Sequence, residues 1–410
     1  MPRAGQVKPP SDERLSDRIA IGLLTATFPP ELVDRVVDAT GRRERRQRLL
    51  PARVVVYFTL AMCVFSQVGY EEVARLLTHG LAWARRWRGA WQVPTTGSLT
   101  RARARLGAEP LAALFGQTAG PLATPATPGA WYRGWRLVVV DGTTLDVADT
   151  PANQQAFGRP QTHRGEQSAY PQVRVVGVAE CGTHALLDAT MGPLANGETT
   201  LAAGLLGEGG ALQAGMLLLA DRLFAGAELW RRAAATGAQL LWRTRSNAVL
   251  PVLEAFADGS YLSQITAATD RRHGVAPTVV RVVEYRLDDP GRPKAKGQVY
   301  RLLTTILDPD AAPAAELAAL YHQRWEVEGL LDELKTHQRG PGVVLRSKTP
   351  EMVAQEVWAM LLVHRAIRTL MHQAALDGGN GQALDPDRLS FARSLRVVRR
   401  QVTGQAAFSP

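Results

Sequence analysis

The amino-acid sequence predicts an α/β protein in which an all-α N-terminal region precedes a mixed β-sheet. Apolar residues recur with helical spacing through most of residues 15–125. Residues 136–147 instead form a β-branched apolar run, which is typical of a strand buried on both faces. Residues 170–244 then follow the order strand, strand, helix, strand, helix, strand. Such an order is the pattern of an α/β domain with a mixed sheet.

The length and the charge of the chain narrow its class. At 410 residues the chain has room for two or three domains with a substantial core. It contains 48 Lys and Arg residues against 38 Asp and Glu residues, a formal net charge of +10. This excess favours a polyanionic partner, most simply nucleic acid, although charge alone fits a generally basic protein equally well.

The sequence gives no indication of secretion, of a membrane span or of a cysteine-based metal site. Residues 1–14 are polar and contain prolines, so we expect a flexible N-terminus rather than a signal peptide. The apolar run at 54–65 has about a dozen residues where a span needs roughly twenty, so it predicts a buried helix. Cys63 and Cys181 lie far apart, which argues against a zinc or disulfide framework and fits the cytoplasm.

Two basic segments lie in the helical region. Residues 96–100 form a small-residue turn before a short helix that carries Arg101, Arg103 and Arg105 at alternate positions. A turn followed by a basic helix suits a DNA-binding helix-turn-helix, but a solvated Arg-rich helix end has the same sequence. The Arg-rich run at 42–48 predicts a loop that touches backbone phosphates. The helices expected in this region cover residues 15–25, 30–39, 51–66, 70–87 and 111–116.

Two acidic residues follow buried strands of the predicted sheet. A Gly- and Pro-rich linker at 120–134 leads into the first strand, where Asp141 follows four aliphatic residues and is expected to end the strand. Asp221 follows the strand expected at 216–220. Open α/β sheets place their chemistry at the carboxyl ends of strands, so both carboxylates are candidate metal ligands. A tight turn at Asp141 and a helix N-cap at Asp221 are the simpler alternatives.

Residues 246–300 interrupt the α/β pattern with a segment rich in β-forming residues. We expect strands at 278–287 and 298–306, which flank a basic loop, and therefore predict a β-rich insertion. A helix at 312–335 follows, and a Gly-Pro-Gly break separates it from the rest of the chain. The C-terminal segments are a long helix at 350–375 and an Arg-rich stretch at 387–402.

The helix before the Gly-Pro-Gly break gathers its charges on one stripe. At about 100° per residue, Arg324 and Glu328 lie roughly 60° and 20° from Tyr321. Lys335 lies about 40° from Tyr321 on the same side. A solvated helix more often spreads its charges for pairing at i,i+4, so we expect this stripe to face a pocket. By the same arithmetic Glu326 and Glu333 point away from this stripe, whereas Asp332 lies near it and remains an alternative to Glu328.

Together, the carboxylates of Asp141, Asp221 and Glu328 would provide an oxygen-only ligand set. Such a set suits Mg²⁺ or Mn²⁺. Two such ions, about 3.5 to 4 Å apart, stabilise both the attacking and the leaving oxygen of an in-line phosphoryl displacement. The residues therefore favour phosphoryl-transfer chemistry, with Asp332 still open as an alternative to Glu328.

The spacing Tyr321-x2-Arg324-x3-Glu328-x6-Lys335 resembles, position for position, the signature of the insertion element 4 family of cut-and-paste DDE transposases. Four residues at three fixed spacings seldom recur by chance. The resemblance selects Glu328 rather than Asp332 as the third acid.

The acids of the two buried strands are also similar to the motifs of this family. Asp141-Gly142-Thr143 resembles its first acidic motif, and residues 219–224 resemble its second. The resemblance spans most of the chain and implies a ribonuclease H-like catalytic core with a β-rich insertion. The implied domains are a helical DNA-binding domain at 15–125, a core at 135–245 and 301–345, the insertion at 246–300 and a helical C-terminal region at 346–410.

The function that the resemblance implies is DNA transposition. It implies metal-dependent cleavage at the terminal inverted repeats of a bacterial insertion sequence and strand transfer into target DNA. Double-stranded DNA is the implied substrate, and a homodimer would pair the two element ends in the cytoplasm, at the nucleoid. A metal-dependent nuclease that cuts without joining, and an inactive relative that only binds specific DNA, are the alternatives.

The resemblance also implies roles for individual residues. Asp141, Asp221 and Glu328 would be catalytic and would hold two Mg²⁺ or Mn²⁺ ions per active site. The remaining three residues of the helix signature would bind DNA phosphate, and they are Tyr321, Arg324 and Lys335. Two tryptophans could stack on an unpaired base or belong to the core, and they are Trp242 and Trp325.

Overall fold

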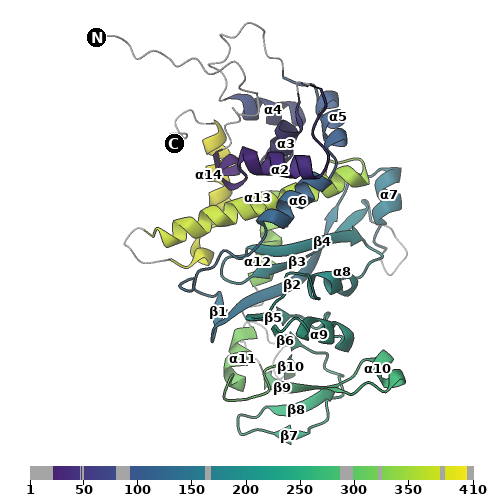
Figure 1. Ribbon diagram of the computed structural model, residues 1–410, viewed down its shortest axis with the longest axis vertical. Helices are drawn as coiled ribbons and strands as arrows, with labels where there is room; N and C mark the ends of the chain where they lie inside the picture. Colours follow the sequence, from purple (N-terminus) through teal and green to yellow (C-terminus); the bar gives the residue numbers. More distant parts are fainter. Residues whose placement is uncertain are drawn as a thin grey trace. The chain divides into compact units, whose positions relative to one another are not determined.

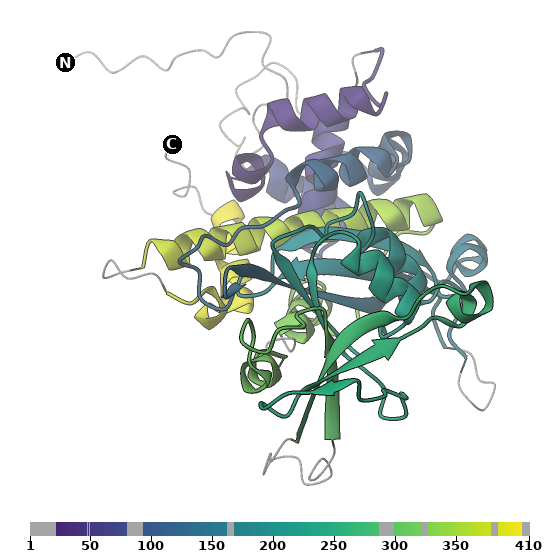
Figure 2. The same cartoon turned by 60° about the horizontal axis from the view of Figure 1, so that its bottom comes forward.

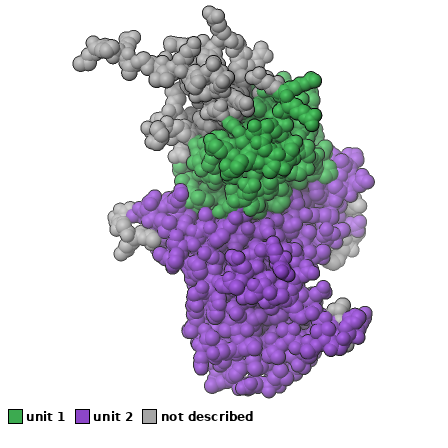
Figure 3. Space-filling view, in the orientation of Figure 1, with its two compact units in different colours: residues 1–118, 334–370, 390–410 green, residues 119–333, 371–389 purple. Residues whose placement is uncertain are grey.

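A computed structural model gives the fold of the chain over residues 22–46, 48, 50–79, 93–161, 168–286, 299–321, 326–378 and 384–403. The chain divides into two compact units, coloured separately in Figure 3. Unit 1 comprises Met1–Thr118, Leu334–Leu370 and Ser390–Pro410, and unit 2 comprises Ala119–Glu333 and Met371–Leu389. The predicted N-terminal helical domain and most of the predicted C-terminal region therefore belong to one unit, because they pack together.

Unit 1 is helical and is organised around α3 (Ala52–Val64), which contacts the three helices α2, α4 and α5. Every residue of α3 except Arg53 is buried, and Arg53 pairs with Asp34 of α2. The apolar run at 54–65 is therefore a buried helix, as predicted. No helix among the described residues is long and apolar enough to cross a membrane. The other helices of this unit are α1 (Gly22–Thr27), α2 (Pro30–Ala39), α4 (Tyr70–His79), α5 (Thr96–Leu106), α6 (Glu109–Thr118), most of α13 (Pro350–Leu376), and α14 (Phe391–Thr403).

Unit 2 contains a ten-stranded mixed sheet with the order β4-β3-β2-β5-β6-β10-β9-β8-β7, and β1 pairs with β2 (Figure 1). The strands β2, β5 and β6 run parallel, and the remaining pairings are antiparallel. The strands are β1 (Trp131–Tyr132), β2 (Trp135–Asp146), β3 (Gln172–Glu180), β4 (Leu186–Pro193), β5 (Met216–Ala220), β6 (Gln239–Arg243), β7 (Glu254–Ala255), β8 (Tyr261–Ile265), β9 (Thr278–Arg286) and β10 (Val299–Thr304).

Helices α8 (Glu198–Leu205) and α9 (Ala227–Ala234) cover one face of the sheet (Figure 1). The core on this face takes Val138 and Val140 from β2 and Leu218 and Ala220 from β5. Side chains alternate between the two faces of a strand, so the odd-numbered residues of both strands point to the other face. In Figure 1, α12 (Glu326–Asp332) lies behind the sheet, on that other face, and it contacts β2.

The predicted insertion is a continuation of the core sheet. Its strand β10 pairs with β6, and β9, β8 and β7 follow in order, so these four strands extend the sheet of unit 2. Figure 2 brings this end of the unit forward and shows the green strands side by side. The sequence did not reveal this, because the pairing of β10 with β6 is a long-range contact. The predicted basic loop at 288–297 lies outside the described residues.

The predicted fold class is confirmed. Unit 2 is an α/β structure with a mixed sheet, and the region before it is helical, as the sequence indicates. The remaining helices of unit 2 are α7 (Pro151–Phe157), α10 (Ala268–His273), α11 (Ala314–Tyr321) and the short 3-10 helix η6 (Pro386–Arg388).

Candidate active site

The register of two parallel strands brings Asp141 and Asp221 to the same level of the sheet. The printed pairs of β2 and β5 run from Arg136 opposite Met216 to Val139 opposite Leu219. Two further steps in the same register align Asp141 with Asp221, which directly follows the end of β5. The two acids predicted from separate motifs are therefore neighbours at one edge of the parallel pairing.

Asp141 does not end its strand, contrary to the prediction. Strand β2 continues to Asp146, and Asp141 pairs with Gly177 of β3. What ends near Asp141 is the pairing with β5, so the residue lies where the sheet opens on one side. Its Oδ1 accepts a hydrogen bond of 2.8 Å from the amide of Gly142. The carboxylate is thus carried by a strand that β3 holds rigidly.

Gly142 allows a close approach from the opposite face. A Cβ atom on Gly142 would lie 2.7 Å from the Cγ and Cδ atoms of Glu198, the first residue of α8. Adjacent strand residues face opposite sides, so Glu198 is on the α8 face and Asp141 is on the other. The Asp-Gly pair is therefore no turn: Gly142 leaves room for the side chain of Glu198 behind the candidate catalytic strand. Sequence reasoning missed Glu198, since no local pattern links it to Gly142.

The end of β5 is fixed by a hydrogen bond from the helix α11. The hydroxyl of Tyr321 is buried and donates a bond of 3.1 Å to the carbonyl oxygen of Ala220, the residue before Asp221. Asp221 itself accepts a hydrogen bond from the amide of Leu223. The predicted phosphate contact of Tyr321 is corrected here: a phenol has one O–H donor, and this one is given to Ala220. Tyr321 thus positions the strand end that carries Asp221.

Glu328 lies on α12, the helix that contacts β2 on the face of Asp141, and its side chain is exposed. Beneath the next residue, Gly329, lies the ring of His184, whose Cε1 would be 3.4 Å from an added Cβ. The ring nitrogens of His184 lie 3.6 Å from Glu333 and 3.3 Å from Asp387. His184 therefore packs under α12. Its backbone φ of 55° is an uncommon, strained value for a residue other than glycine, and no sequence pattern predicted it.

The predicted continuous helix at 312–335 takes a different form at its end. Residues up to Tyr321 form α11 and residues from Glu326 form α12, as the predicted helix requires, and the residues between them lie outside the described part of the chain. What differs is the end, where a π-helix, η5 (Glu333–Gln338), follows α12. The i→i+5 bonds of a π-helix widen the turn, so 100° per residue does not hold beyond Asp332. The angle predicted for Lys335 is therefore wrong, and its half-buried side chain belongs to unit 1. Arg324 and Trp325 lie outside the described residues.

The three candidate acids have the chemistry of ligands for a divalent cation. Among the described residues, no three His, Cys, Asp or Glu side chains come close enough to hold a metal ion. Carboxylate oxygens are nevertheless the donors that Mg²⁺ and Mn²⁺ prefer. Asp141 and Asp221 share one level of the sheet, and Glu328 lies on the helix against that face. The donor atoms of these residues are therefore of the type that a divalent cation prefers.

The predicted helix-turn-helix is wrong in its local structure. Residues 96–100 lie inside α5, which begins at Thr96 after the N-cap residue Thr95. Residues two apart on a helix point about 200° apart, so Arg103 faces away from Arg101 and Arg105. Arg101 and Arg105 are exposed, as DNA binding requires.

Arg103 is a structural residue and not a DNA ligand. Its side chain is 0% exposed and donates to Gln355 Oε1 at 2.7 Å and to Ser347 Oγ at 3.0 Å. It also donates to the Tyr70 hydroxyl and the Met352 carbonyl. A guanidinium with these buried partners cannot reach a phosphate.

Trp242 belongs to the core and cannot stack on a base. It is fully buried on β6 and packs edge-on against Trp230 of α9, with ring centroids 5.1 Å apart.

Family models match most of the chain. Residues 18–116 match the model described as insertion element 4 transposase N-terminal, and residues 133–365 match the model described as transposase DDE domain. The chain therefore belongs to the insertion element 4 family of DDE transposases.

The transposase InsG and the protein InsZ are relatives of this chain. The transposase InsG of insertion sequence element IS4 from Escherichia coli K12 is 30% identical over 383 residues, which cover 93% of this chain and 83% of InsG. InsZ of the same strain is 27% identical over 214 residues, which cover 52% of this chain and 68% of InsZ. A cryo-EM structure of a piggyBac transposase synaptic complex with hairpin DNA aligns with 93% of this chain and 80% of that chain, at 12% identity and a TM-score of 0.49.

The chain is thus a DNA transposase of an insertion sequence, and it is an enzyme of the DDE class. Transposases with this domain act on DNA and generally depend on divalent metal ions. The expected function and class of enzyme are confirmed.

Proposed function

We propose that Asp141, Asp221 and Glu328 form the catalytic site, and that the enzyme cleaves DNA at the terminal inverted repeats of its element and joins the ends to target DNA. The observation that carries this proposal is the parallel register of β2 and β5, which aligns Asp141 with Asp221 on the face against α12. Two Mg²⁺ or Mn²⁺ ions, when bound, would activate the attacking oxygen and stabilise the leaving one.

The protein contributes position to this chemistry. Asp141 is fixed by the ladder between β2 and β3, which continues on both sides of it. Asp221 is fixed by the bond from Tyr321 to Ala220 and by its own bond from the Leu223 amide. Glu328 is carried by α12, which His184 supports from below. The three acids thus come from separate elements, so each is anchored independently before DNA binds.

Basic residues would hold the DNA. We assign Arg324 to a bidentate phosphate contact and Lys335 to a point charge near the cleaved end, on the strength of the signature spacing. Arg101 and Arg105 are exposed on α5 and would contact backbone phosphate in unit 1. We further propose a homodimer that pairs the two element ends and acts on DNA at the nucleoid.

The test is an assay of the purified chain with Mg²⁺ and linear DNA that carries the terminal repeats of the element. The proposal predicts cleavage at the repeat ends and then joining of the 3′-hydroxyl ends to a target plasmid. Cleavage without joining would indicate a nuclease, and binding with neither step would indicate a DNA-binding protein. Either outcome would overturn the proposed strand transfer.

A further inference from the structure

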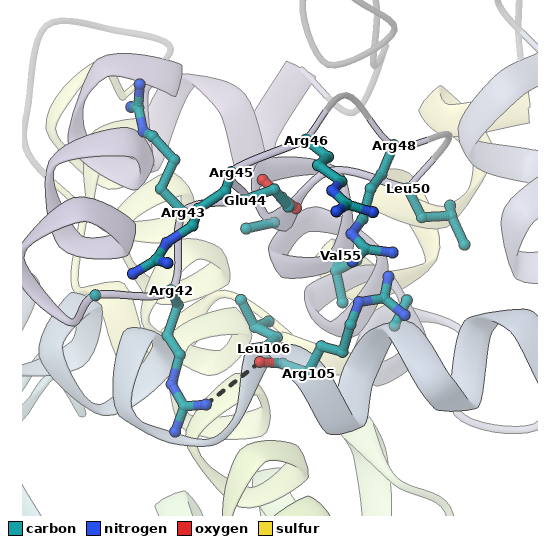
Figure 4. A pocket seen from close by; sticks show the side chains of 13 residues that line it. Arg42, Arg43, Glu44, Arg45, Arg46, Arg48, Leu50, Val55, Arg105 and Leu106 are labelled. Atoms are coloured by element: carbon teal, nitrogen blue, oxygen red, sulfur yellow. Dashed lines mark hydrogen bonds between the residues drawn. The ribbon is translucent and has the colours of Figure 1, made fainter.

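A cavity in unit 1 combines two basic segments that are distant in the sequence. It has a volume of about 440 Å³ and lies between the loop after α2 and the helices α3 and α5 (Figure 4). Arginines at 42–48 line it from the loop, and Arg105 lines it from α5. The apolar part of the lining is formed by Leu50, Ala52, Val55, Ala102 and Leu106.

The charge of this cavity is strongly unbalanced. Six of its lining residues are arginines, and Glu44 is the one acid among them. Two of the arginines have partners: Arg42 pairs with Glu109 at 3.0 Å, and Arg43 pairs with Asp38. The other four are exposed, and the described residues give their side chains no hydrogen bond or ion pair; they are Arg45, Arg46, Arg48 and Arg105.

Three of these unpaired side chains converge. Figure 4 shows the guanidinium groups of Arg46 and Arg48, from the loop, and of Arg105, from α5, turned toward one another at one side of the cavity. Like charges that point into one space repel one another, and an anion bound between them offsets this repulsion. Guanidinium groups present paired donors that match the oxygens of a phosphate.

The lining also indicates which part of a nucleic acid would enter. None of the described lining residues is aromatic, so the cavity offers no aromatic ring on which a base could stack. Arginines without aromatic neighbours suit the phosphate backbone of DNA. Contacts with that backbone carry no sequence information.

We propose that this cavity binds a backbone phosphate of double-stranded DNA, with Arg46, Arg48 and Arg105 as its ligands. The identity of the DNA as the substrate rests on the proposed function, but the phosphate site itself does not. The site joins two segments that the sequence presents as unrelated, a loop run and a helix end. Through this site, unit 1 would bind duplex DNA independently of the base sequence.

The experiment compares the full chain with the variant Arg46→Gln/Arg48→Gln/Arg105→Gln. Binding to a linear duplex with the element end, and to a random duplex of equal length, is measured between about 50 and 200 mM salt. We expect the Kd to rise about tenfold for both duplexes, and the slope of log K against log salt to become shallower by about one. The triple Arg→Lys variant restores charge and is expected to recover most of the slope.

The matched control is Arg35→Gln, which removes an exposed arginine of α2 that does not line the cavity. It is expected to leave the salt slope unchanged. Circular dichroism checks that all variants are folded. If the triple variant binds both duplexes as the wild type does, the proposal is wrong.

A measurement of the Tm with added inorganic phosphate distinguishes a site for free phosphate from a site for the phosphate of DNA. If phosphate raises the Tm of the wild type and not of the triple variant, while DNA binding is equal in both, the cavity is a free-phosphate site and the DNA proposal is overturned. Loss of affinity for the end duplex alone would also overturn it, because that result indicates base recognition. A wild type that binds DNA with the expected slope but neither cleaves nor joins would contradict the proposed function and leave this site intact.

Discussion

Strand β2 of unit 2 and helix α5 of unit 1 each carry a candidate functional residue, Asp141 and Arg105, but residues two apart are arranged in opposite ways in them. In β2, Leu137, Val139 and Asp141 share one face because side chains of a strand alternate. In α5, Arg103 points away from Arg101 and Arg105 because residues two apart on a helix lie about 200° apart. The same spacing therefore places Asp141, the proposed catalytic residue, on one face with its neighbours in the strand, and separates a structural cation from two exposed ones in the helix.

The largest expected effect concerns the strand face. Asp141→Asn, Asp221→Asn or Glu328→Gln removes the charge of a proposed metal ligand, and several kcal/mol of transition-state stabilisation correspond to a loss of roughly 10³-fold or more in cleavage rate. Single-turnover cleavage of end-bearing DNA measures this, and binding of the end is expected to remain. Asp332→Asn on the same helix is the control and is expected to keep its activity. A variant of the first three with full activity would remove that residue from the site.

The second prediction compares the buried Arg103 with the exposed Arg105 of α5. Arg103→Met leaves Gln355 and Ser347 without their buried partner, so we expect the free energy of unfolding to fall by about 2 to 4 kcal/mol. Arg105→Met changes an exposed side chain on the same helix and is expected to fall within about 0.5 kcal/mol of the wild type. Urea unfolding of both variants gives the comparison. Equal stabilities would contradict the assignment of Arg103 as structural.

A smaller effect tests the two faces of β2 directly. Gly142→Ala would place a Cβ 2.7 Å from Glu198, so we expect a loss of about 1 to 3 kcal/mol in stability. Glu198→Ala removes the obstructing atoms, and the double variant is expected to recover most of that loss. Additive losses in this double-mutant cycle would show that Gly142 does not face α8.

The smallest effect concerns a carboxylate of the opposite face. Asp188 of β4 pairs with Val178, a core residue of the α8 side, and burial raises the pKa of its carboxyl group. A folded-state pKa above the ordinary value of 3.8 means that stability is full below that pH and falls as pH rises through the folded pKa. Asp188→Asn is therefore expected to raise the Tm at pH 7 by about 2 °C and to have no effect at pH 3. A Tm difference that is the same at both pH values would contradict this.

Local patterns in the sequence were sufficient for much of the fold. The prediction of α2 and of β5 was correct at both ends, since a Pro at the helix start and a short aliphatic run need no distant partner. The alignment of Asp141 with Asp221 was also accessible, because parallel strands present their carboxyl ends at one edge.

What the sequence did not reveal depends on distant contacts. The burial of Arg103 is decided by Gln355, which lies 252 residues away. The continuation of β2 past Asp141 depends on pairing with β3, and the extension of the sheet depends on the pairing of β10 with β6. The π-helix that begins at Glu333 has no local signal, so helical arithmetic failed for Lys335. For Tyr321, the partner of the hydroxyl is a carbonyl on another element.

The central claim is that the three acids converge on divalent cations when DNA is bound. The most direct measurement is the anomalous scattering of Mn²⁺ in crystals of the full chain with an end-bearing duplex. We expect anomalous peaks of Mn²⁺ between the carboxylates of Asp141, Asp221 and Glu328, and we expect these peaks to be absent from crystals of Asp221→Asn. Mn²⁺ bound elsewhere in the chain, with these three carboxylates apart, would contradict it.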